Sequence, residues 1–176
     1  MNISVERQKI IQIVGFSNTG KTTLVTNIIR KLNNKKIKVS TIKSAPTHKI
    51  EDHGKDSDKN FFSGGVSTAV LFSNGTQITF SELSLEQTIG LINEYTNSDL
   101  IIIEGFKKLD FPKIIVWTKN IDLSLFNLDN LIGVYCPSNI YKENEKDVKL
   151  FVKKYNFNLF KSDEQIIELL LEEFKL

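Results

Sequence analysis

One eight-residue segment has the residue types and spacing that bind phosphate. It reads Gly15-Phe16-Ser17-Asn18-Thr19-Gly20-Lys21-Thr22 and matches the pattern G-x-x-x-x-G-K-[ST]. Glycines permit backbone angles that side chains disfavour, so successive backbone N–H groups can converge on a phosphate at a helix start. The Lys21 ammonium can reach the β- and γ-phosphates, and the Thr22 hydroxyl can bind the Mg²⁺ that a nucleotide carries. The segment predicts a nucleotide-binding site that includes Gly15, Ser17, Asn18, Thr19, Gly20, Lys21, Thr22 and Thr23.

Two carboxylates are candidates for holding Mg²⁺ or orienting water beside the phosphates. Glu104 follows the apolar residues 100–103, at the end of an expected strand, where phosphate-loop proteins often place an acid. The usual acid there is Asp, so the longer Glu104 side chain could instead orient water. Asp56 lies in a long polar segment and is the second candidate. We predict that Glu104 and Asp56 act in catalysis and, with Thr22, bind the metal; the alternative for both acids is a solvated charge.

Other chemistry-bearing residues do not define a site. His48 and His53 share the polar segment with acidic neighbours, but their spacing fits no standard zinc pattern, and two solvated histidines are the simpler interpretation. Cys136 is the only cysteine, so no disulfide can form within the chain. Residues 118–122 differ from the guanine-binding motif N-K-x-D, because Ile121 occupies the Asp position. The choice of base therefore stays open from the residues alone.

The elements that must position these residues follow from hydrophobic periodicity. Residues 9–14 form a short run rich in β-branched residues, and they predict a buried strand directly before the phosphate loop. Leu24, Ile28 and Leu32 recur at four-residue spacing and predict a helix after the loop. Residues 37–42 return to strand character. Strand, helix and strand together predict a βαβ unit.

The rest of the chain alternates in the same way. Residues 68–72 and 76–80 flank Asn74-Gly75, which predicts a β-hairpin. The segments 84–87 and 162–165 both have the Ser-x-x-Gln form of a capping box, which predicts a helix after each. Further strands are expected at 100–103, 113–117 and 131–135, and a further helix at 145–155. This alternation around an antiparallel hairpin predicts an α/β domain with a mostly parallel sheet.

Length and composition limit the domain count and the partners. The chain has 176 residues, which predicts a single domain over residues 1–176. Its 23 basic and 21 acidic residues give a net charge of +2, too balanced to indicate non-specific binding to nucleic acid. Purely apolar runs such as residues 100–103 are far shorter than a membrane span, and the first residues do not resemble a signal peptide. We expect a soluble cytoplasmic protein that binds neither nucleic acid nor membrane.

Several segments in order resemble the molybdopterin-guanine dinucleotide biosynthesis protein B (MobB) family. They are the phosphate loop, Ile42-Lys43, Gly54-Lys55-Asp56-Ser57, Ser63-Gly64-Gly65, the Asn-Gly hairpin, Ile103-Glu104-Gly105-Phe106-Lys107 and Pro112-Lys113-Ile114. The resemblance covers about residues 9–117 and implies a three-layer P-loop NTPase domain whose mostly parallel sheet is extended by an antiparallel hairpin. One position departs from the family, which tends to have His after the lysine that ends the second strand, where this chain has Ser44.

The resemblance also implies a function. It implies a protein that binds GTP and Mg²⁺ and assists a MobA-like guanylyltransferase, which joins GMP to molybdopterin in molybdenum cofactor biosynthesis. It leaves open whether molybdopterin binds to this chain directly. The family is expected to form homodimers. The alternatives are a P-loop small-molecule kinase and a regulatory GTPase switch.

The basic residues argue against fast phosphoryl transfer, so the chain is expected to be at most a slow GTPase. Arg7 and Arg30 are the only arginines, and neither is placed in sequence as an arginine finger. Lys43, Lys55 and Lys107 are the cations best placed to line the cleft, and lysine lacks the bidentate geometry of arginine. A kinase usually uses arginines to stabilise the transition state, and no arginine follows Arg30.

The hairpin is the expected homodimer interface. Val70, Phe72, Ile78 and Phe80 are expected to form one apolar face of the hairpin. Such a face, or an unpaired strand edge, can be satisfied by a second copy of the chain. The alternative is that the hairpin covers its own domain.

Gly105, which follows Glu104, is expected to leave room beside the γ-phosphate.

Overall fold

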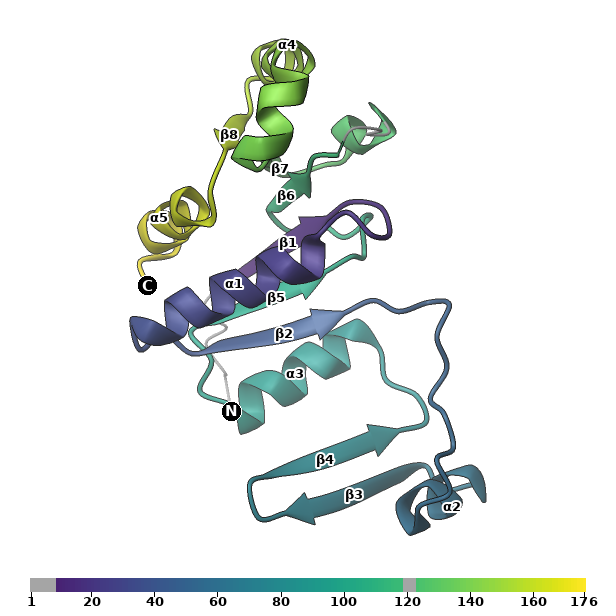
Figure 1. Ribbon diagram of the computed structural model, residues 1–176. Helices are drawn as coiled ribbons and strands as arrows, with labels where there is room; N and C mark the ends of the chain where they lie inside the picture. The colour runs from purple at the N-terminus through teal and green to yellow at the C-terminus, as the bar shows by residue number, and fades with distance from the viewer. Residues whose placement is uncertain (1–8, 119–122) are drawn as a thin grey trace. The chain divides into compact units, whose positions relative to one another are not determined.

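The computed structural model describes residues 9–118 and 123–176, which form two compact units (Figure 1). The first unit consists of the described residues 9–44, 97–118 and 123–176, and the second consists of residues 45–96. Arg7 and residues 119–122, within the variant guanine motif, lie outside the described residues. The single domain expected over the whole chain stays a prediction. Across 9–118 and 123–176, we find no helix that combines the length and apolar character needed to cross a membrane.

The first unit is built on a six-stranded sheet in the order β2-β5-β1-β6-β7-β8, in which neighbouring strands are parallel. The strands are β1 (Ile10–Val14), β2 (Val39–Lys43), β5 (Leu100–Glu104), β6 (Lys113–Val116), β7 (Leu131–Tyr135) and β8 (Asn158–Phe160). The three central strands are buried at every residue, as strands covered on both faces should be. The mostly parallel sheet is confirmed, and β8 is an addition that the sequence patterns did not predict.

Helices cover both faces of this sheet and complete three layers (Figure 1). Alternate strand residues belong to two separate cores, because successive side chains of a strand point to opposite faces. Ile13 and Ile114 pack with α1 (Lys21–Asn34) and α5 (Asp163–Phe174). On the other face, Val14 and Ile115 pack with α4 (Ser138–Tyr155) and with the short helix η1 (Leu123–Asn127). The three-layer α/β prediction is therefore confirmed.

The start of α5 differs from the predicted capping box. Ser162 precedes the helix, but its side chain accepts no bond from the backbone N–H groups of the first turn. The Glu164 carboxylate in the first turn of α5 pairs with Lys31 of α1. Lys31 makes a second ion pair with Asp163 at 2.9 Å. Gln165 Oε1 accepts from the Lys161 backbone N–H at 2.6 Å, one residue before the N-cap, so the expected capping box does not form.

The second unit contains a hairpin and two helices. β3 (Ser67–Phe72) and β4 (Gly75–Phe80) form a separate antiparallel two-stranded sheet. α2 (Asp56–Phe62) lies in the polar segment where no helix was predicted, and α3 (Leu85–Tyr95) follows the hairpin. Here the predicted capping box is present, because Ser84 Oγ accepts from Gln87 N at 3.2 Å and Gln87 Oε1 accepts from Ser84 N at 2.8 Å.

The strand register corrects the predicted apolar face of the hairpin. Ile78 lies opposite Ala69, so Ile78 and Phe80 share a face with the odd-numbered residues of β3. Val70 and Phe72 lie on the opposite face. The expectation of one face with all four apolar residues was wrong, because residues of equal parity on the two strands lie on different faces in this register.

Candidate nucleotide-binding site

The phosphate loop joins the buried strand β1 to the start of α1. Gly20 occupies the N-cap position with φ 83°, a left-handed conformation that glycine adopts readily. No side chain caps the helix, and its first turn contains no acidic residue. The N-terminal N–H groups and the positive end of the helix dipole are thus left for an anion.

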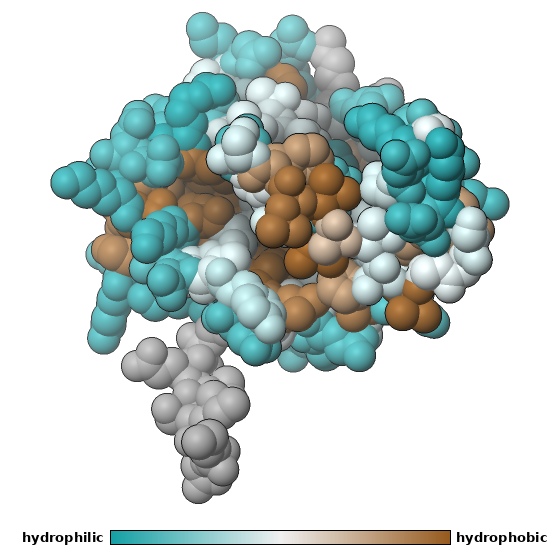
Figure 2. Space-filling view, turned by 90° about the horizontal axis from the view of Figure 1, so that it is seen from below, coloured by the Kyte–Doolittle hydropathy of each residue, from teal (hydrophilic) through white to brown (hydrophobic). Residues whose placement is uncertain are grey.

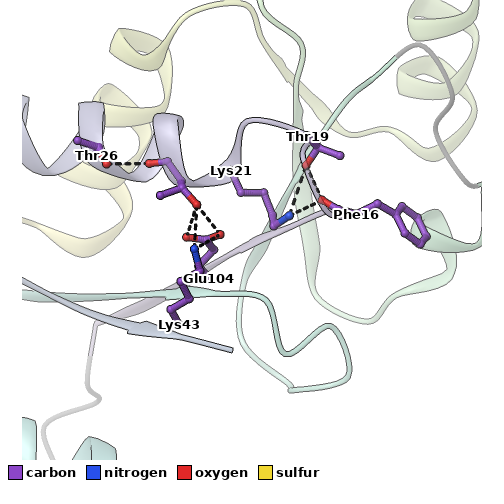
Figure 3. Close-up of polar contacts among 7 residues, drawn as sticks. Phe16, Thr19, Lys21, Thr26, Lys43 and Glu104 are labelled. Carbon is purple, nitrogen blue, oxygen red and sulfur yellow. Dashed lines mark hydrogen bonds and ion pairs between the residues drawn. The ribbon is translucent and has the colours of Figure 1, made fainter. Parts of the chain in front are cut away.

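Lys21 directs its ammonium back into the loop. Its Nζ donates to the Phe16 carbonyl and, at 3.4 Å, to Thr19 Oγ1 (Figure 3). The Thr19 hydroxyl itself donates to the Phe16 carbonyl at 2.9 Å. Partial burial lowers the pKa of Lys21, and the nearby Glu104 carboxylate opposes that change. The ammonium is therefore held at the loop that is expected to bind phosphates.

The structure brings Thr22 and Glu104 together, as the sequence predicts for a shared metal site. The Thr22 hydroxyl donates to Glu104 Oε1 at 2.9 Å and to Oε2 at 3.0 Å (Figure 3). The Glu104 side chain is 11% exposed and ends the central strand β5. A hydroxyl and a carboxylate offer the hard oxygen ligands that Mg²⁺ prefers, so this donor set fits the ion.

Lys43 forms a third part of this cluster. β2 is paired with β5 so that Lys43 lies beside Glu104 in the register. Its Nζ donates to Thr22 Oγ1 at 3.2 Å and lies 3.6 Å from Glu104 Oε1. The sequence placed Lys43 among the cations of the cleft, but the contact with Thr22 depends on the order of the strands.

Gly105 follows Glu104 and lies close to Ser44. Its φ is 95°, and a Cβ at this position would lie 2.9 Å from the Cβ of Ser44. The Ser44 backbone N–H also donates to the Glu104 carbonyl at 2.9 Å. A side chain at position 105 would thus meet Ser44, and the expected room for a γ-phosphate beside Gly105 stays a prediction.

Gln12 is a positioning residue that the motifs missed. It is fully buried in β1, and its Nε2 donates to the carbonyls of Gly105 at 3.1 Å and Phe106 at 3.0 Å. These bonds hold the chain directly after Glu104. The signal in the sequence is one amide inside an otherwise apolar strand, because a buried polar side chain needs partners.

Lys113 lies at the other end of the segment that follows Glu104. Residues 105–112 run from β5 to β6, the two strands on either side of β1. Lys113 is buried, and its Nζ donates to the carbonyls of Phe111 at 3.0 Å and Asp129 at 2.7 Å. Burial lowers the pKa of Lys113, whereas Asp110 and Asp129 oppose that change. Buried polar side chains therefore fix both ends of the segment.

The other residues predicted to bind the nucleotide are mostly exposed. Ser17, Asn18 and Thr23 are exposed, and Asn18 has the left-handed φ of 60°. Gly15 is buried, and a Cβ there would lie 3.0 Å from the Thr19 hydroxyl oxygen. Their nucleotide contacts stay predictions.

Asp56 and the histidines belong to the second unit. Asp56 begins α2, its side chain is 97% exposed, and it pairs with Lys59 at 3.2 Å. Lys55 precedes the helix as its N-cap residue, and His48 and His53 are exposed. The part of the chain that the structure describes contains no group of three or more His, Cys, Asp or Glu side chains able to hold a metal. The roles of Asp56 and Lys55 stay predictions.

Two further cations of the first unit have other partners. Lys107 Nζ lies 3.6 Å from the centre of the exposed Phe16 ring, a cation–π contact beside the loop. Arg30 lies in the third turn of α1, where it bonds to Asn27 Oδ1 at 3.4 Å. Arg30 thus occupies the helix surface away from the loop, as the sequence indicated.

This geometry defines a class of protein. A G-x-x-x-x-G-K-T loop joins a central parallel strand to a helix, and the acid at the end of the neighbouring strand accepts a bond from the threonine of the loop. Those features are typical of P-loop NTPases. A family model, MobB (molybdopterin guanine dinucleotide synthesis protein B), matches residues 10–136. The chain belongs to the MobB family.

Individual relatives agree with the family match. A protein of Bacillus subtilis (strain 168) named "Probable molybdopterin-guanine dinucleotide biosynthesis adapter protein" is 31% identical over 142 residues, which are 77% of this chain and 78% of that protein. The molybdopterin-guanine dinucleotide biosynthesis adapter protein of Haemophilus influenzae is 28% identical over 127 residues, covering 70% of this chain and 71% of the relative. The solved structure of Bacillus subtilis MobB superposes with a TM-score of 0.69 at 25% identity and covers 93% of this chain and 95% of that one.

Proposed function

We propose that this chain binds GTP with Mg²⁺ and acts as an adapter in molybdenum cofactor biosynthesis, where it assists a MobA-like guanylyltransferase in transferring GMP to molybdopterin. Family membership and the names of the relatives support the adapter role. The observation that carries nucleotide binding is the contact of Thr22 with Glu104 beside an uncapped helix start. Glu104 and Asp56 are the proposed acids of the site, and Thr22 is the third proposed metal ligand.

The proposed adapter hydrolyses GTP slowly by itself. Fast phosphoryl transfer uses preorganised cations, and an arginine finger is worth about 10³–10⁵ in rate. In the described residues, the cations near the loop are lysines: Lys21 inside it, Lys43 on Thr22 and Lys107 on Phe16. Lysine is a point charge without a bidentate fork, so it supports holding a triphosphate better than cleaving one.

The adapter is proposed to work as a homodimer that pairs through the second unit. One face of its hairpin carries Leu71 and Ile78, which are 80% and 55% exposed. The other face lines a cavity of about 140 Å³ together with Phe61 and Phe62 of α2. Figure 2 shows apolar surface gathered in patches on one side of the molecule. A second copy of the chain would remove such surface from water.

Calorimetry and a coupled assay test the proposed function. We expect Mg·GTP to bind more tightly than Mg·ATP, and phosphate release at saturating Mg·GTP to stay well below the ~10 s⁻¹ median of enzymes. Adding the guanylyltransferase and molybdopterin should increase guanylation without fast GTP consumption by this chain. Rapid turnover of the isolated protein, or phosphate transfer to one of a panel of small acceptors, would favour a hydrolase or the kinase alternative.

A further inference from the structure

The contacts that Lys43 makes with Thr22 and Glu104 compete with the binding of a metal ion to the same two side chains. A hydroxyl group has one proton to donate, and Thr22 directs its proton toward the two Glu104 oxygens at 2.9 and 3.0 Å. The oxygen of the same hydroxyl accepts from Lys43 Nζ at 3.2 Å. Lys43 therefore uses a lone pair of Thr22, and a metal ion would require a lone pair of this same atom.

Geometry and charge make the two cations exclude each other. Mg²⁺ binds oxygen atoms at about 2.0–2.1 Å with near-octahedral coordination geometry. Such an ion on Thr22 would leave little space for an ammonium group on the same hydroxyl. Lys43 Nζ also lies 3.6 Å from Glu104 Oε1, so it neutralises the carboxylate that the ion would use. A monovalent and a divalent cation only a few ångströms apart repel each other, most strongly at a partly buried site.

Lys43 is able to leave this position. Its side chain is 57% exposed and extends from β2, the edge strand of the sheet. Lysine is a flexible point charge that water solvates well, so its release costs little. Lys113 is the contrasting case, because it is buried and bonded to two backbone carbonyls.

We propose that Lys43 is a resident counter-ion of the metal site, bound to Thr22 and Glu104 until a divalent cation that enters with the nucleotide displaces it. Lys43 thereby sets how strongly the protein distinguishes a metal-bound nucleotide from a free one. This inference rests on the proposed function, because it requires that the loop binds a nucleotide with Mg²⁺.

The test compares GTP affinity with saturating Mg²⁺ and with a chelator present. The ratio of the two affinities is the metal factor. Lys43→Met removes the competing charge, and we expect its metal factor to exceed that of the wild type by about fivefold, the size of one exposed charge-assisted hydrogen bond. Lys43→Arg keeps the charge and should keep the wild-type factor.

Lys107→Met is the matched control for loss of a positive charge near the loop. The charge of Lys107 acts on Lys21, as the charge of Lys43 does. Lys107 contacts the Phe16 ring, however, and not Thr22. Lys107→Met should therefore lower GTP affinity in both buffers, somewhat more for free GTP because free GTP is more negative than Mg·GTP, and its metal factor should rise much less than that of Lys43→Met. Chemical denaturation of each variant without nucleotide checks that the fold is retained.

The outcomes separate this inference from the proposed function. A metal factor in Lys43→Met equal to or below that of the wild type, with GTP still bound, would overturn the displacement of Lys43 alone. An increase of equal size in Lys107→Met would also overturn it, because the effect would then be general electrostatics. A wild-type protein that binds no GTP in either buffer would overturn the proposed function, and this inference with it.

Discussion

The two units of the molecule differ in how much they bury. In the first unit, every residue of β1, β5 and β6 is buried, and cores form on both faces of the sheet. In the second unit, all of whose residues 45–96 are described, no residue is buried. Burial of apolar surface contributes roughly 25 cal/mol per Å², so the first unit has its own source of stability. The second unit has exposed apolar surface that another molecule can cover. The proposed nucleotide site and the proposed pairing surface therefore lie in different units.

The largest expected effect tests this difference in stability. Ile102 is fully buried in β5, so Ile102→Ala should lower the free energy of unfolding by about 2–5 kcal/mol in urea denaturation. The matched change in the second unit, Ile78→Ala, should alter it by less than about 0.5 kcal/mol in dilute, monomeric protein. Similar losses from the two substitutions would mean that the hairpin shares in the core.

A lysine from each unit tests where the nucleotide binds. Lys21→Ala removes a charge-assisted contact with the phosphates and should weaken GTP binding by about 3 kcal/mol or more, while the protein stays folded. Lys55→Ala, in the second unit, should have a much smaller effect. Calorimetric titration of both variants measures the difference, and unchanged GTP affinity in Lys21→Ala would contradict the phosphate-loop assignment.

The hairpin surface can be tested through the oligomeric state. Ile78→Asp places a charge on the exposed apolar face and should weaken the proposed dimer by about 2 kcal/mol, roughly 30-fold. Sedimentation at micromolar concentration should show a wild-type dimer and a larger monomer fraction in the variant. A clean wild-type monomer near 20 kDa would remove the homodimer from the proposal.

The two proposed acids lie in different units, so paired amide substitutions can rank them. Glu104→Gln should weaken the dependence of binding or turnover on Mg²⁺ by about tenfold, with a smaller change in nucleotide affinity itself. Asp56→Asn is expected to change the same Mg²⁺ dependence less, because its side chain is solvated in the described unit. Equal Mg²⁺ dependence in the wild type and Glu104→Gln would make Glu104 a solvated strand-end charge.

The smallest expected effect is on the stability of the protein at low pH. It comes from an ion pair within the first unit, between Lys31 and Glu164. The bond from Lys31 lowers the pKa of Glu164 from 4.5 to about 2. A carboxyl with a lowered pKa stabilises the fold above its unfolded pKa, and this contribution is lost as pH falls from about 4.5 to 2. Glu164→Gln should therefore reduce the loss of stability over that interval. Denaturation at several pH values measures it, and an unchanged pH dependence would show that the exposed pair contributes nothing.

The sequence predicted the parts of the fold whose patterns are local. The apolar run at 100–103, the helical stripe from Leu24 to Leu32 and the Asn-Gly turn each specify one element, and all three were confirmed. α2 was missed because its seven residues lie in a polar segment and none of them is buried, so no apolar stripe marks it. β8 was missed because three residues are too few to show a period.

The contacts of the site required the order of the strands. Lys43, Thr22 and Glu104 come from three separate elements, and only the pairing of β2 with β5 places the lysine on the threonine. The hairpin faces likewise depend on register, since a shift by one residue exchanges the faces. Gln12 could be noticed as an amide among apolar neighbours, but its bonds to Gly105 and Phe106 could not be derived from that pattern.

The pairing of β2 with β5 has a consequence for how proteins of this kind can change. These strands are adjacent and parallel, and a crossover between parallel neighbours needs roughly a dozen residues. The chain instead places the whole segment 45–96 between them. The sheet therefore does not require the hairpin for its own connectivity, and this segment can lengthen, shorten or be exchanged while β2 and β5, which carry Lys43 and Glu104, keep their register. The proposed pairing surface and the proposed nucleotide site can accordingly evolve as separate traits.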